Sequence, residues 1–174
     1  MVHEEARLGY PPKAGIVTVS ESRYLRYMRG DAVDDESGDL AEELLRGSGI
    51  NNVERVLVGD RVWMICSAIN KLVNSGCELI VVIGGTGLSK GDVTAEALES
   101  IIERRLNLYP VLYGIKSVDE VDTRVLATRL VAGFYRDALI VSTPGSKKAV
   151  ESILKNVLKS EYIHLLWLNK FAKI

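Results

Sequence analysis

Short apolar runs alternate along the chain with longer segments in which apolar residues recur at helical spacing. The apolar runs cover residues 15–20, 53–58, 79–83 and 138–142, and their length and composition predict β-strands. Helices are predicted from helical spacing near residues 40–49, 62–76, 94–105, 120–135 and 149–157. The run at 79–83 is apolar at every position, as expected for a strand that is buried on both faces. Strands that alternate with helices predict right-handed βαβ units and a parallel sheet.

These elements predict one α/β domain over residues 1–174, with a doubly wound sheet covered by helices on both faces. No linker, repeat or low-complexity segment divides the chain. Two segments do not follow the alternation. Residues 21–38 are mostly polar and predict a solvated connection, whereas residues 106–119, which contain Pro110 and Gly114, predict a short edge strand.

Composition narrows the possible partners and location of the protein. The 174 residues include 22 Lys and Arg against 23 Asp and Glu, and a net charge of −1 argues against general nucleic-acid binding. No apolar run approaches the roughly 20 residues needed to cross a bilayer, and the acidic N-terminus does not resemble a signal peptide. The two cysteines form no C-x-x-C pair, and two histidines are too few for a histidine-based metal site. We therefore expect a cytoplasmic protein that binds neither nucleic acid nor membranes.

Candidate binding residues follow each predicted strand. In open parallel sheets, ligands bind outside the carboxyl ends of the strands, near the point where the strand order reverses. Ser20 follows the first strand, Asp60 the second, a glycine-rich loop at 84–92 the third, and Pro144-Gly145-Ser146 the last. Because the carboxyl ends of parallel strands meet at one edge of the sheet, we expect these groups to gather there.

The loop that begins Gly84-Gly85-Thr86-Gly87 is the strongest local signal. Glycines allow left-handed backbone conformations and close approach to a ligand, so that N–H groups can form an anion-binding nest. The loop lacks the Gly-Lys pair of a Walker A motif, and Lys90 stands where a dinucleotide-binding fingerprint would need glycine. On spacing alone, a phosphate cradle and a simple tight strand-to-helix connection remain equally good interpretations.

Asp60 and Asp92 each precede a predicted helix, where an aspartate most often serves as an N-cap. The alternative is functional, because carboxylates beside a phosphate nest need a bridging cation, and Mg²⁺ accepts one or two carboxylates together with phosphate oxygens and water. Ser146 has the same two interpretations, N-cap or phosphate ligand. Lys147 and Lys148 follow it in the first helical turn, where the helix dipole disfavours cations unless an anion is bound.

Five short motifs occur together in a fixed order. They are Gly15-Ile-Val-Thr-Val-Ser-Glu-Ser-Arg23, Asp35-Glu-Ser-Gly38, Asp60, Gly84-Gly-Thr-Gly87 with Asp92-Val-Thr94, and Pro144-Gly-Ser146 with Ala149-Val150. In this order the chain resembles, from Lys13 to Leu168, the MoaB/MogA family of molybdenum cofactor biosynthesis proteins, which is related to the G domain of gephyrin. The resemblance implies a three-layer α/β/α fold with its core at residues 13–168, and a homotrimer or homohexamer.

The resemblance also implies an activity, molybdopterin adenylyltransfer. The terminal phosphate of molybdopterin would attack the α-phosphate of ATP with the help of Mg²⁺ and release pyrophosphate. Matched by position, Asp60 and Asp92 would be catalytic, with Asp92 also a metal ligand. The residues implied in substrate binding are Ser20, Ser37, Gly38, Gly84, Gly85, Thr86, Gly87, Thr128, Arg129, Pro144, Gly145 and Ser146.

The chain departs from the family at a few positions. Many members have Asp where Glu21 stands and Pro where Lys147 stands, and the Gly-Phe segment that helps to shape the substrate site is not recognisable within residues 108–116. Two alternatives therefore accompany the adenylyltransferase: a molybdopterin-binding or assembly protein without catalysis, and a nucleotide-pyrophosphate hydrolase of the competence-damage-inducible (CinA) type. Retention of both aspartates favours the transferase, and the lack of a second domain argues against the hydrolase.

Overall fold

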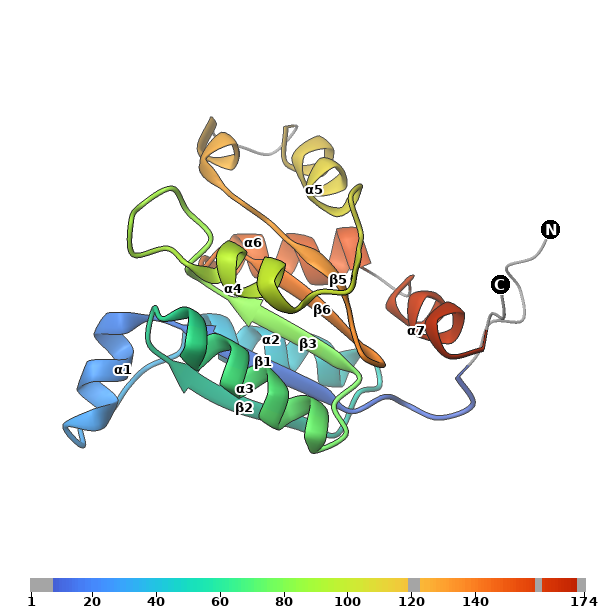
Figure 1. The fold of residues 1–174 in the computed structure, drawn as a ribbon, viewed down its shortest axis with the longest axis horizontal. Helices are drawn as coiled ribbons and strands as arrows, with labels where there is room; N and C mark the ends of the chain where they lie inside the picture. The colour runs from blue at the N-terminus through green and yellow to red at the C-terminus, as the bar shows by residue number, and fades with distance from the viewer. Residues whose placement is uncertain (1–7, 119–122, 159–160, 172–174) are drawn as a thin grey trace.

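The computed structural model describes residues 8–118, 123–158 and 161–171, which build a six-stranded sheet in the order β2-β1-β3-β6-β5-β4 (Figure 1). The strands are β1 (Ala14–Val19), β2 (Val53–Val58), β3 (Leu79–Ile83), β4 (Arg104–Arg105), β5 (Ala132–Tyr135) and β6 (Ala138–Thr143). The first three and β6 run parallel, whereas β5 pairs antiparallel with both β6 and β4. The prediction of a doubly wound, mostly parallel sheet is confirmed.

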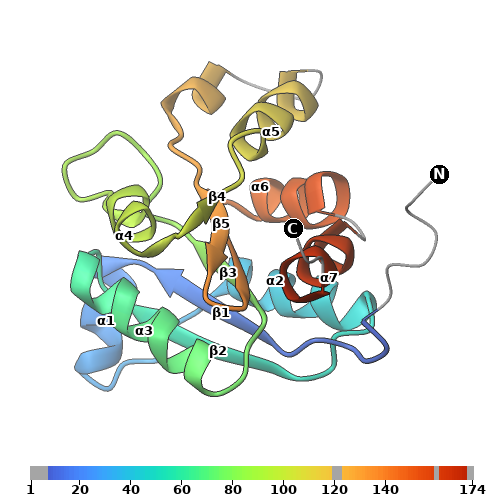
Figure 2. The same ribbon diagram turned by 45° about the vertical axis from the view of Figure 1, so that its right-hand side comes forward.

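Helices cover both faces of the sheet. The helices are α1 (Glu21–Met28), α2 (Glu36–Gly47), α3 (Val62–Asn74), α4 (Thr94–Ile101), α5 (Tyr109–Val118), α6 (Lys147–Ser152) and α7 (Glu161–Phe171), with a 3₁₀ turn η1 (Thr123–Ala127) and a π-helix η2 (Ile153–Leu158). Helices α2, α5, α6 and α7 pack on one face, and α3 and α4 pack on the other (Figure 2). The result is the three-layer α/β/α arrangement that the family resemblance implied.

Alternation along the strands divides the core into two halves. In β1, Ile16 points into the half covered by α2, and the next residue, Val17, points into the half covered by α3. In β3, Val81 and Val82 divide in the same way, and both are fully buried. The continuous apolar run at 79–83 is therefore explained by burial on both faces, as predicted.

One predicted helix is wrong in type. Residues 120–135 were predicted to be helical, but Thr123–Ala127 form a 3₁₀ turn and Ala132–Tyr135 form β5; residues 120–122 of this prediction lie outside the described part. Strand β5 turns back onto β6 at Arg136, which has a left-handed φ of 53°. Strand β5 is only four residues long and directly follows apolar Leu130 and Val131. Taken together with those two residues, its apolar positions can be mistaken for the spacing of a helix.

Other boundaries also differ from the prediction. The helix predicted over 94–105 ends at Ile101, and Arg104–Arg105 form the edge strand β4. The edge strand predicted within 106–119 is instead helix α5, where Pro110 is tolerated because it lies in the first turn. The solvated segment at 21–38 contains helix α1, which has no buried residue. The helix predicted over 149–157 begins at Lys147 and becomes η2 at Ile153.

In the described part of the chain, no helix is both long and apolar enough to cross a membrane.

Candidate functional site

The strand order places the glycine loop at the point where the topology reverses. The chain passes from β1 to β2 on one side and then to β3 on the other side of β1, so the crevice opens between the ends of β1 and β3. Ser20 follows β1, and Gly84 follows β3 with a left-handed φ of 97°. A Cβ on Gly84 would lie 2.5 Å from the carbonyl oxygen of Val19, so the loop leaves the sheet in close contact with β1.

Two residues, Thr94 and Arg129, hold the backbone of the glycine loop. The buried Thr94 donates from Oγ1 to the carbonyl of Gly84 at 2.8 Å and from its amide to the carbonyl of Gly85 at 2.9 Å. Arg129 donates from its amide to the carbonyl of Thr86 at 2.7 Å and from Nε to the carbonyl of Gly87 at 2.9 Å. The carbonyls of all four residues from Gly84 to Gly87 thus accept hydrogen bonds from within the protein.

Arg129 and Thr128 lie on the chain just before β5. Besides the glycine loop, the Arg129 guanidinium donates to the carbonyl of Asp92 at 2.6 Å and pairs with Glu96. The Thr128 hydroxyl donates to the carbonyl of Val125 at 2.8 Å. Both residues matched substrate-binding positions of the family, and in this structure their polar groups shape the loop and the preceding turn.

The two aspartates border the glycine loop and do not cap the helices that follow them. The N-caps of α3 and α4 are Arg61 and Val93, neither of which makes a side-chain capping bond. Asp60 accepts a hydrogen bond on Oδ2 from the amide of Glu21 at 2.7 Å, and its Oδ1 lies 3.1 Å from where a Cβ on Gly85 would stand. The N-cap interpretation of Asp60 is therefore wrong.

Asp92 closes the other side of the same loop. Its Oδ2 accepts from the amide of Ser89 at 3.1 Å, and the same atom lies 2.8 Å from where a Cβ on Gly87 would stand. A side chain larger than hydrogen at position 87 would therefore displace the carboxylate. The N-cap interpretation is wrong for Asp92 as well, and the carboxylates stand beside Gly85 and Gly87, as expected for residues that share a ligand with the loop.

The two carboxylates influence each other electrostatically. The pKa of Asp60 is raised above its usual value, first by burial and then by the negative charges of Asp92 and Glu21, against a hydrogen bond from the Glu21 amide and the positive charge of Arg61. A cation held beside the two carboxylates would reduce the repulsion between their negative charges. The described residues contain no group of three His, Cys, Asp or Glu side chains that could hold a metal. The two carboxylates of Asp60 and Asp92 fit Mg²⁺, which takes few carboxylates and completes its shell with phosphate oxygens and water.

The Pro144-Gly145-Ser146 turn joins the site from the end of β6. Ser146 caps α6 by accepting from the amide of Ala149 at 3.2 Å, so its N-cap interpretation is confirmed. Lys147 pairs with Glu36 at 2.9 Å, so a carboxylate from α2, rather than the bound anion considered above, offsets the unfavourable interaction of this lysine with the helix dipole. The Ser37 hydroxyl donates to the carbonyl of Gly145 at 2.7 Å and thereby ties the start of α2 to this turn.

Asp35 is a structural member of the site that the sequence did not single out as a functional residue. It caps α2 by accepting on Oδ1 from the amide of Gly38 at 3.1 Å, while Oδ2 accepts from Thr18 Oγ1 at 2.6 Å and from Arg55 at 2.8 Å. A Cβ on Gly38 would collide with the Asp35 carboxylate and would lie 2.6 Å from the Arg55 guanidinium. Gly38 is therefore required by this charged cluster, whatever the ligand. The Asp-x-Ser-Gly pattern is a recognisable N-cap signal and could have identified Asp35.

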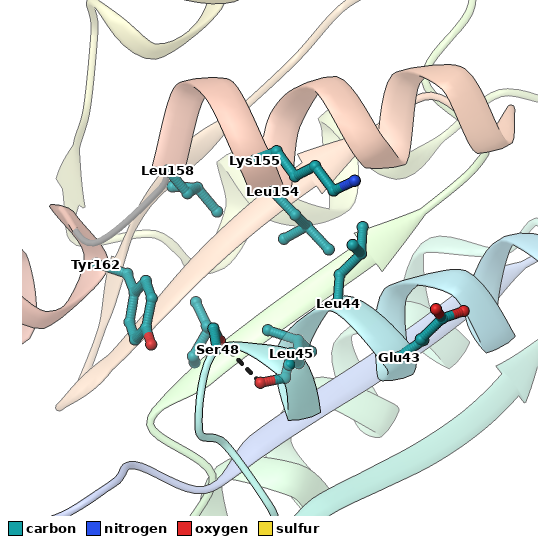
Figure 3. A pocket seen from close by; sticks show the side chains of 10 residues that line it. Glu43, Leu44, Leu45, Ser48, Leu154, Lys155, Leu158 and Tyr162 are labelled. Atoms are coloured by element: carbon teal, nitrogen blue, oxygen red, sulfur yellow. Dashed lines mark hydrogen bonds between the residues drawn. The ribbon is translucent and has the colours of Figure 1, made fainter.

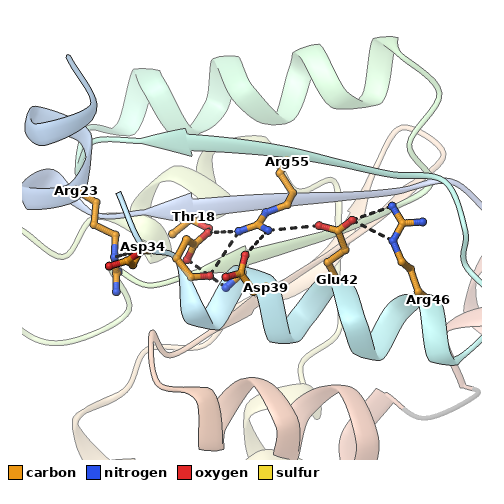
Figure 4. Close-up of polar contacts among 9 residues, drawn as sticks. Thr18, Arg23, Asp34, Asp39, Glu42, Arg46 and Arg55 are labelled. Atoms are coloured by element: carbon orange, nitrogen blue, oxygen red, sulfur yellow. Dashed lines mark hydrogen bonds and ion pairs between the residues drawn. The ribbon is translucent and has the colours of Figure 1, made fainter. Parts of the chain in front are cut away.

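The charged cluster continues along α2 (Figure 4). Arg55 pairs with Asp39 at 2.5 Å and with Glu42 at 3.3 Å, and Glu42 in turn pairs with Arg46 at 2.8 Å. Because Arg55 belongs to β2 and its partners belong to α2, the cluster fixes α2 against the sheet edge. The position of Ser37, and through it that of the Pro-Gly-Ser turn, depends on Asp35.

Asp35→Asn should therefore destabilise the protein, by about 1–3 kcal/mol at pH 7. Burial opposes ionisation of Asp35, but hydrogen bonds from Thr18, Arg55 and Gly38 outweigh it and lower its pKa below the usual 3.8. A lowered folded-state pKa means that the carboxylate stabilises the fold above about pH 4 and that this contribution is lost as the pH falls through the folded-state value. Urea unfolding at pH 7 and at about pH 3 measures the difference.

The exposed neighbour Asp34 supplies the matched control. Its side chain can be changed to asparagine while its backbone carbonyl still accepts from Arg23 at 2.9 Å, so Asp34→Asn should leave stability nearly unchanged at both pH values. A stability gap between wild type and Asp35→Asn that does not shrink in acid would contradict the role assigned to the ionised carboxylate.

A separate apolar cavity of about 500 Å³ lies at the opposite end of the sheet (Figure 3). It is lined mainly by leucines from the end of α2 and from η2, together with Tyr162 and with Leu79, the first residue of β3. Because the glycine loop follows the last residue of β3, this cavity is not part of the candidate site.

Comparisons with known proteins agree with the geometry. A family profile described as "Probable molybdopterin binding domain" matches residues 15–164. The chain is 36% identical over 155 residues to a "Probable molybdopterin adenylyltransferase" of Methanocaldococcus jannaschii, covering 88% of this chain and 91% of that protein. It is 31% identical to "Molybdenum cofactor biosynthesis protein B" of Staphylococcus aureus, covering 94% and 95%. The crystal structure of the tungsten cofactor synthesizing protein MoaB from Pyrococcus furiosus superposes with a TM-score of 0.78 at 30% identity, covering 90% and 95%.

Proposed function

The chain belongs to the molybdopterin-binding domain family of the MoaB and MogA proteins, and we propose that it is a molybdopterin adenylyltransferase of molybdenum cofactor biosynthesis. The observation that carries the proposal is the placement of Asp60 and Asp92 beside the glycine loop, where neither caps a helix. A protein that only bound an anionic ligand would gain nothing from two acids at this place. A nucleotidyltransferase needs such acids to hold a cation against the reacting phosphates.

In the proposed reaction, an oxygen of the terminal phosphate of molybdopterin forms a bond to the α-phosphorus of ATP. The bond from that phosphorus to the oxygen bridging to the β-phosphate breaks, and pyrophosphate leaves with the bonding electrons. The protein forms no covalent bond in this step, so its contribution is alignment and charge neutralisation. Gly85, Thr86 and Gly87 would bind phosphate through their backbone amides, while Gly84, whose amide donates to Thr143, would anchor the loop. The start of α2 with Ser37 and Gly38 would border the same mouth.

Mg²⁺ is the cation that we propose for the site. Asp92 would be its protein ligand, with Asp60 on the other side of the loop. When bound, Mg²⁺ would neutralise phosphate charge during the transfer. This assignment is supported by the placement of both carboxylates against the glycine loop, Asp60 beside Gly85 and Asp92 beside Gly87.

A single assay tests the proposed function. The purified protein is incubated with molybdopterin, Mg²⁺ and ATP labelled in its α-phosphate, and adenylylated pterin and pyrophosphate should accumulate together. Tight binding of the pterin without any product would instead indicate a non-catalytic binding protein. Hydrolysis of a nucleotide diphosphate derivative in the absence of pterin would indicate a pyrophosphate hydrolase.

We also place the protein in the cytoplasm, with neither nucleic acid nor a membrane among its partners. The near-zero net charge supports this placement, and so do Cys66 and Cys77, which are free thiols as expected in a reducing compartment.

A homotrimer or homohexamer is the assembly that we propose, and helix α5 supports it. Leu108, Val111, Leu112 and Ile115 follow one another at helical spacing on a single side of this segment, and each is 47–70% exposed. The opposite side carries the buried residues Tyr109 and Tyr113. An apolar helix face of this kind is typical of a surface that is covered in an assembly.

Placing two charges on the apolar face of α5 should therefore dissociate the assembly. We expect Val111→Glu with Ile115→Glu to lower the molar mass in light scattering to that of the monomer, while circular dichroism stays unchanged. Met28→Glu, on the exposed helix α1, is the control and should leave the mass unaltered. A monomeric wild type would contradict the proposed oligomer, and an oligomeric double variant would contradict the proposed surface.

A further inference from the structure

The loops after β1 and β2 are joined by reciprocal hydrogen bonds at the site. The amide of Glu21 donates to Asp60 Oδ2 at 2.7 Å, and the amide of Asp60 donates to Glu21 Oε2 at 3.1 Å. The backbone of Ser20 is tied to the same loop, since its amide donates to the carbonyl of Val58 at 2.9 Å. Each acid thus accepts from the main chain of the other, and neither can move alone.

Glu21 makes a second set of contacts, with the residue that follows Asp60. Arg61 donates from Nη1 to Glu21 Oε2 at 2.9 Å and from Nη2 to Oε1 at 2.8 Å, which is a two-point pair. Such a pair has a defined orientation as well as charge. Both side chains are 35–44% exposed, so the pair adds little to stability, and its value lies in orientation.

Gly59 shows that the chain makes room for this pair. Its φ is not in the left-handed region, so its backbone conformation does not demand glycine. A Cβ there would lie 2.5 Å from Glu21 Oε2 and 2.7 Å from Arg61 Nη1. The missing side chain at position 59 is therefore explained by the carboxylate and guanidinium that lie over it.

We propose that Glu21 and Arg61 are a positioning pair for Asp60, which holds one carboxylate oxygen on helix α1 and directs the other toward the glycine loop. The inference rests on the proposed function and extends it to two residues outside the glycine loop.

The charges around Asp60 give the pair an electrostatic signature. Three charged groups face Asp60: Glu21 from α1, Arg61 from the start of α3, and Asp92 from the loop before α4. Removing the charge of Glu21 takes away a neighbour that favours the protonated form, so the pKa of Asp60 should fall. Removing the charge of Arg61 takes away a neighbour that favours the ionised form, so the pKa of Asp60 should rise. A loss of structure alone would not move the two variants in opposite directions.

The experiment compares Glu21→Gln and Arg61→Met with wild type in two measurements. Carboxyl ¹³C NMR, with the Asp60 signal identified by its absence in Asp60→Asn, should show opposite pH shifts in the two variants. The adenylylation assay should show kcat reduced about tenfold in each variant with little change in KM for ATP, and an acid limb of the pH profile that moves with the NMR value. Glu21→Asp should keep part of kcat, because it retains the charge without the two-point pair.

The control is Glu151→Gln, which removes an exposed ion pair with Lys155 on the surface of α6 and η2 and should change neither measurement. Opposite NMR shifts without any adenylylation in wild type would leave the positioning pair standing and overturn the proposed function. Adenylylation that is unchanged in both variants, with no shift of the Asp60 signal, would overturn the positioning pair and leave the function standing.

Discussion

Asp92→Asn should lower the rate of adenylylated molybdopterin formation by about 10²- to 10³-fold while leaving the fold intact. The carboxylate stands against the glycine loop and makes one backbone contact, with the amide of Ser89. An asparagine can accept the same bond through its amide oxygen, so the loop keeps its shape. What it cannot supply is the negative charge that holds a divalent cation beside the phosphates. The labelled-ATP assay, with circular dichroism on the same sample, measures both parts.

Asp60→Asn should reduce the rate of adenylylated molybdopterin formation by a similar factor, but it should not lower the stability of the protein at pH 7. The folded-state pKa of Asp60 is raised, chiefly by burial, so the ionised carboxylate opposes folding at neutral pH and becomes less unfavourable as the pH falls through that pKa. Neutral asparagine removes this cost and still accepts from the Glu21 amide. The variant should therefore be at least as stable as wild type at pH 7, with the advantage disappearing in acid, as thermal unfolding at the two pH values would show.

Asp137→Asn is the matched control for both aspartates. Asp137 is exposed in the turn between β5 and β6, at the end of β6 away from the glycine loop, and its replacement should leave rate and stability unchanged. Wild-type rates in Asp60→Asn and Asp92→Asn would remove the mechanism even though family membership would stand. A rate that survives only in Asp92→Asn would assign the cation to Asp60 instead.

The parts of the fold that the sequence predicted are those whose signal is local. Strands β1, β3 and β6 are buried on both faces, and such burial leaves short, mostly apolar runs in the chain, of which only β3 is apolar at every position. Strand β5 is defined by its pairing with β6 through the left-handed Arg136, which four residues of sequence do not encode. Helix α5 is apolar on its buried and its exposed side, so no polar face separates its two apolar stripes and the helical period is hard to recognise in the sequence.

The site divides in the same way. The rule that ligands bind at the carboxyl ends of strands brought together the glycine loop, Asp60 and Asp92 without any coordinates. The residues that support them were not predicted, because their partners are distant in the chain: Asp35 lies 20 residues from Arg55, and Glu21 lies 40 residues from Arg61. Pairs of this kind arise when loops meet at one sheet edge, and no spacing rule describes them.

Gly84→Ala should destabilise the protein by about 2–4 kcal/mol and abolish adenylyltransfer. We expect this large effect on both stability and activity although the substitution removes no functional group. Gly84 has a φ of 97°, which a residue with a Cβ rarely adopts. The added methyl carbon would also lie 2.5 Å from the Val19 carbonyl oxygen, which is backbone of the central strand β1 and cannot turn away. For a chain of this size, the loss corresponds to a decrease in Tm of about 5–15 °C.

The surrounding hydrogen bonds leave the altered loop no easy way to relax. The amide of Gly84 donates to the Thr143 carbonyl at 3.0 Å and its carbonyl accepts from Thr94 at 2.8 Å, so moving the residue breaks contacts to β6 and α4 at once. Gly91→Ala is the control in the same loop, because a Cβ there meets nothing within 4 Å and its φ is not left-handed. If both alanine variants unfold at the same temperature and retain activity, the glycine loop is not the rigid cradle that the proposed reaction requires.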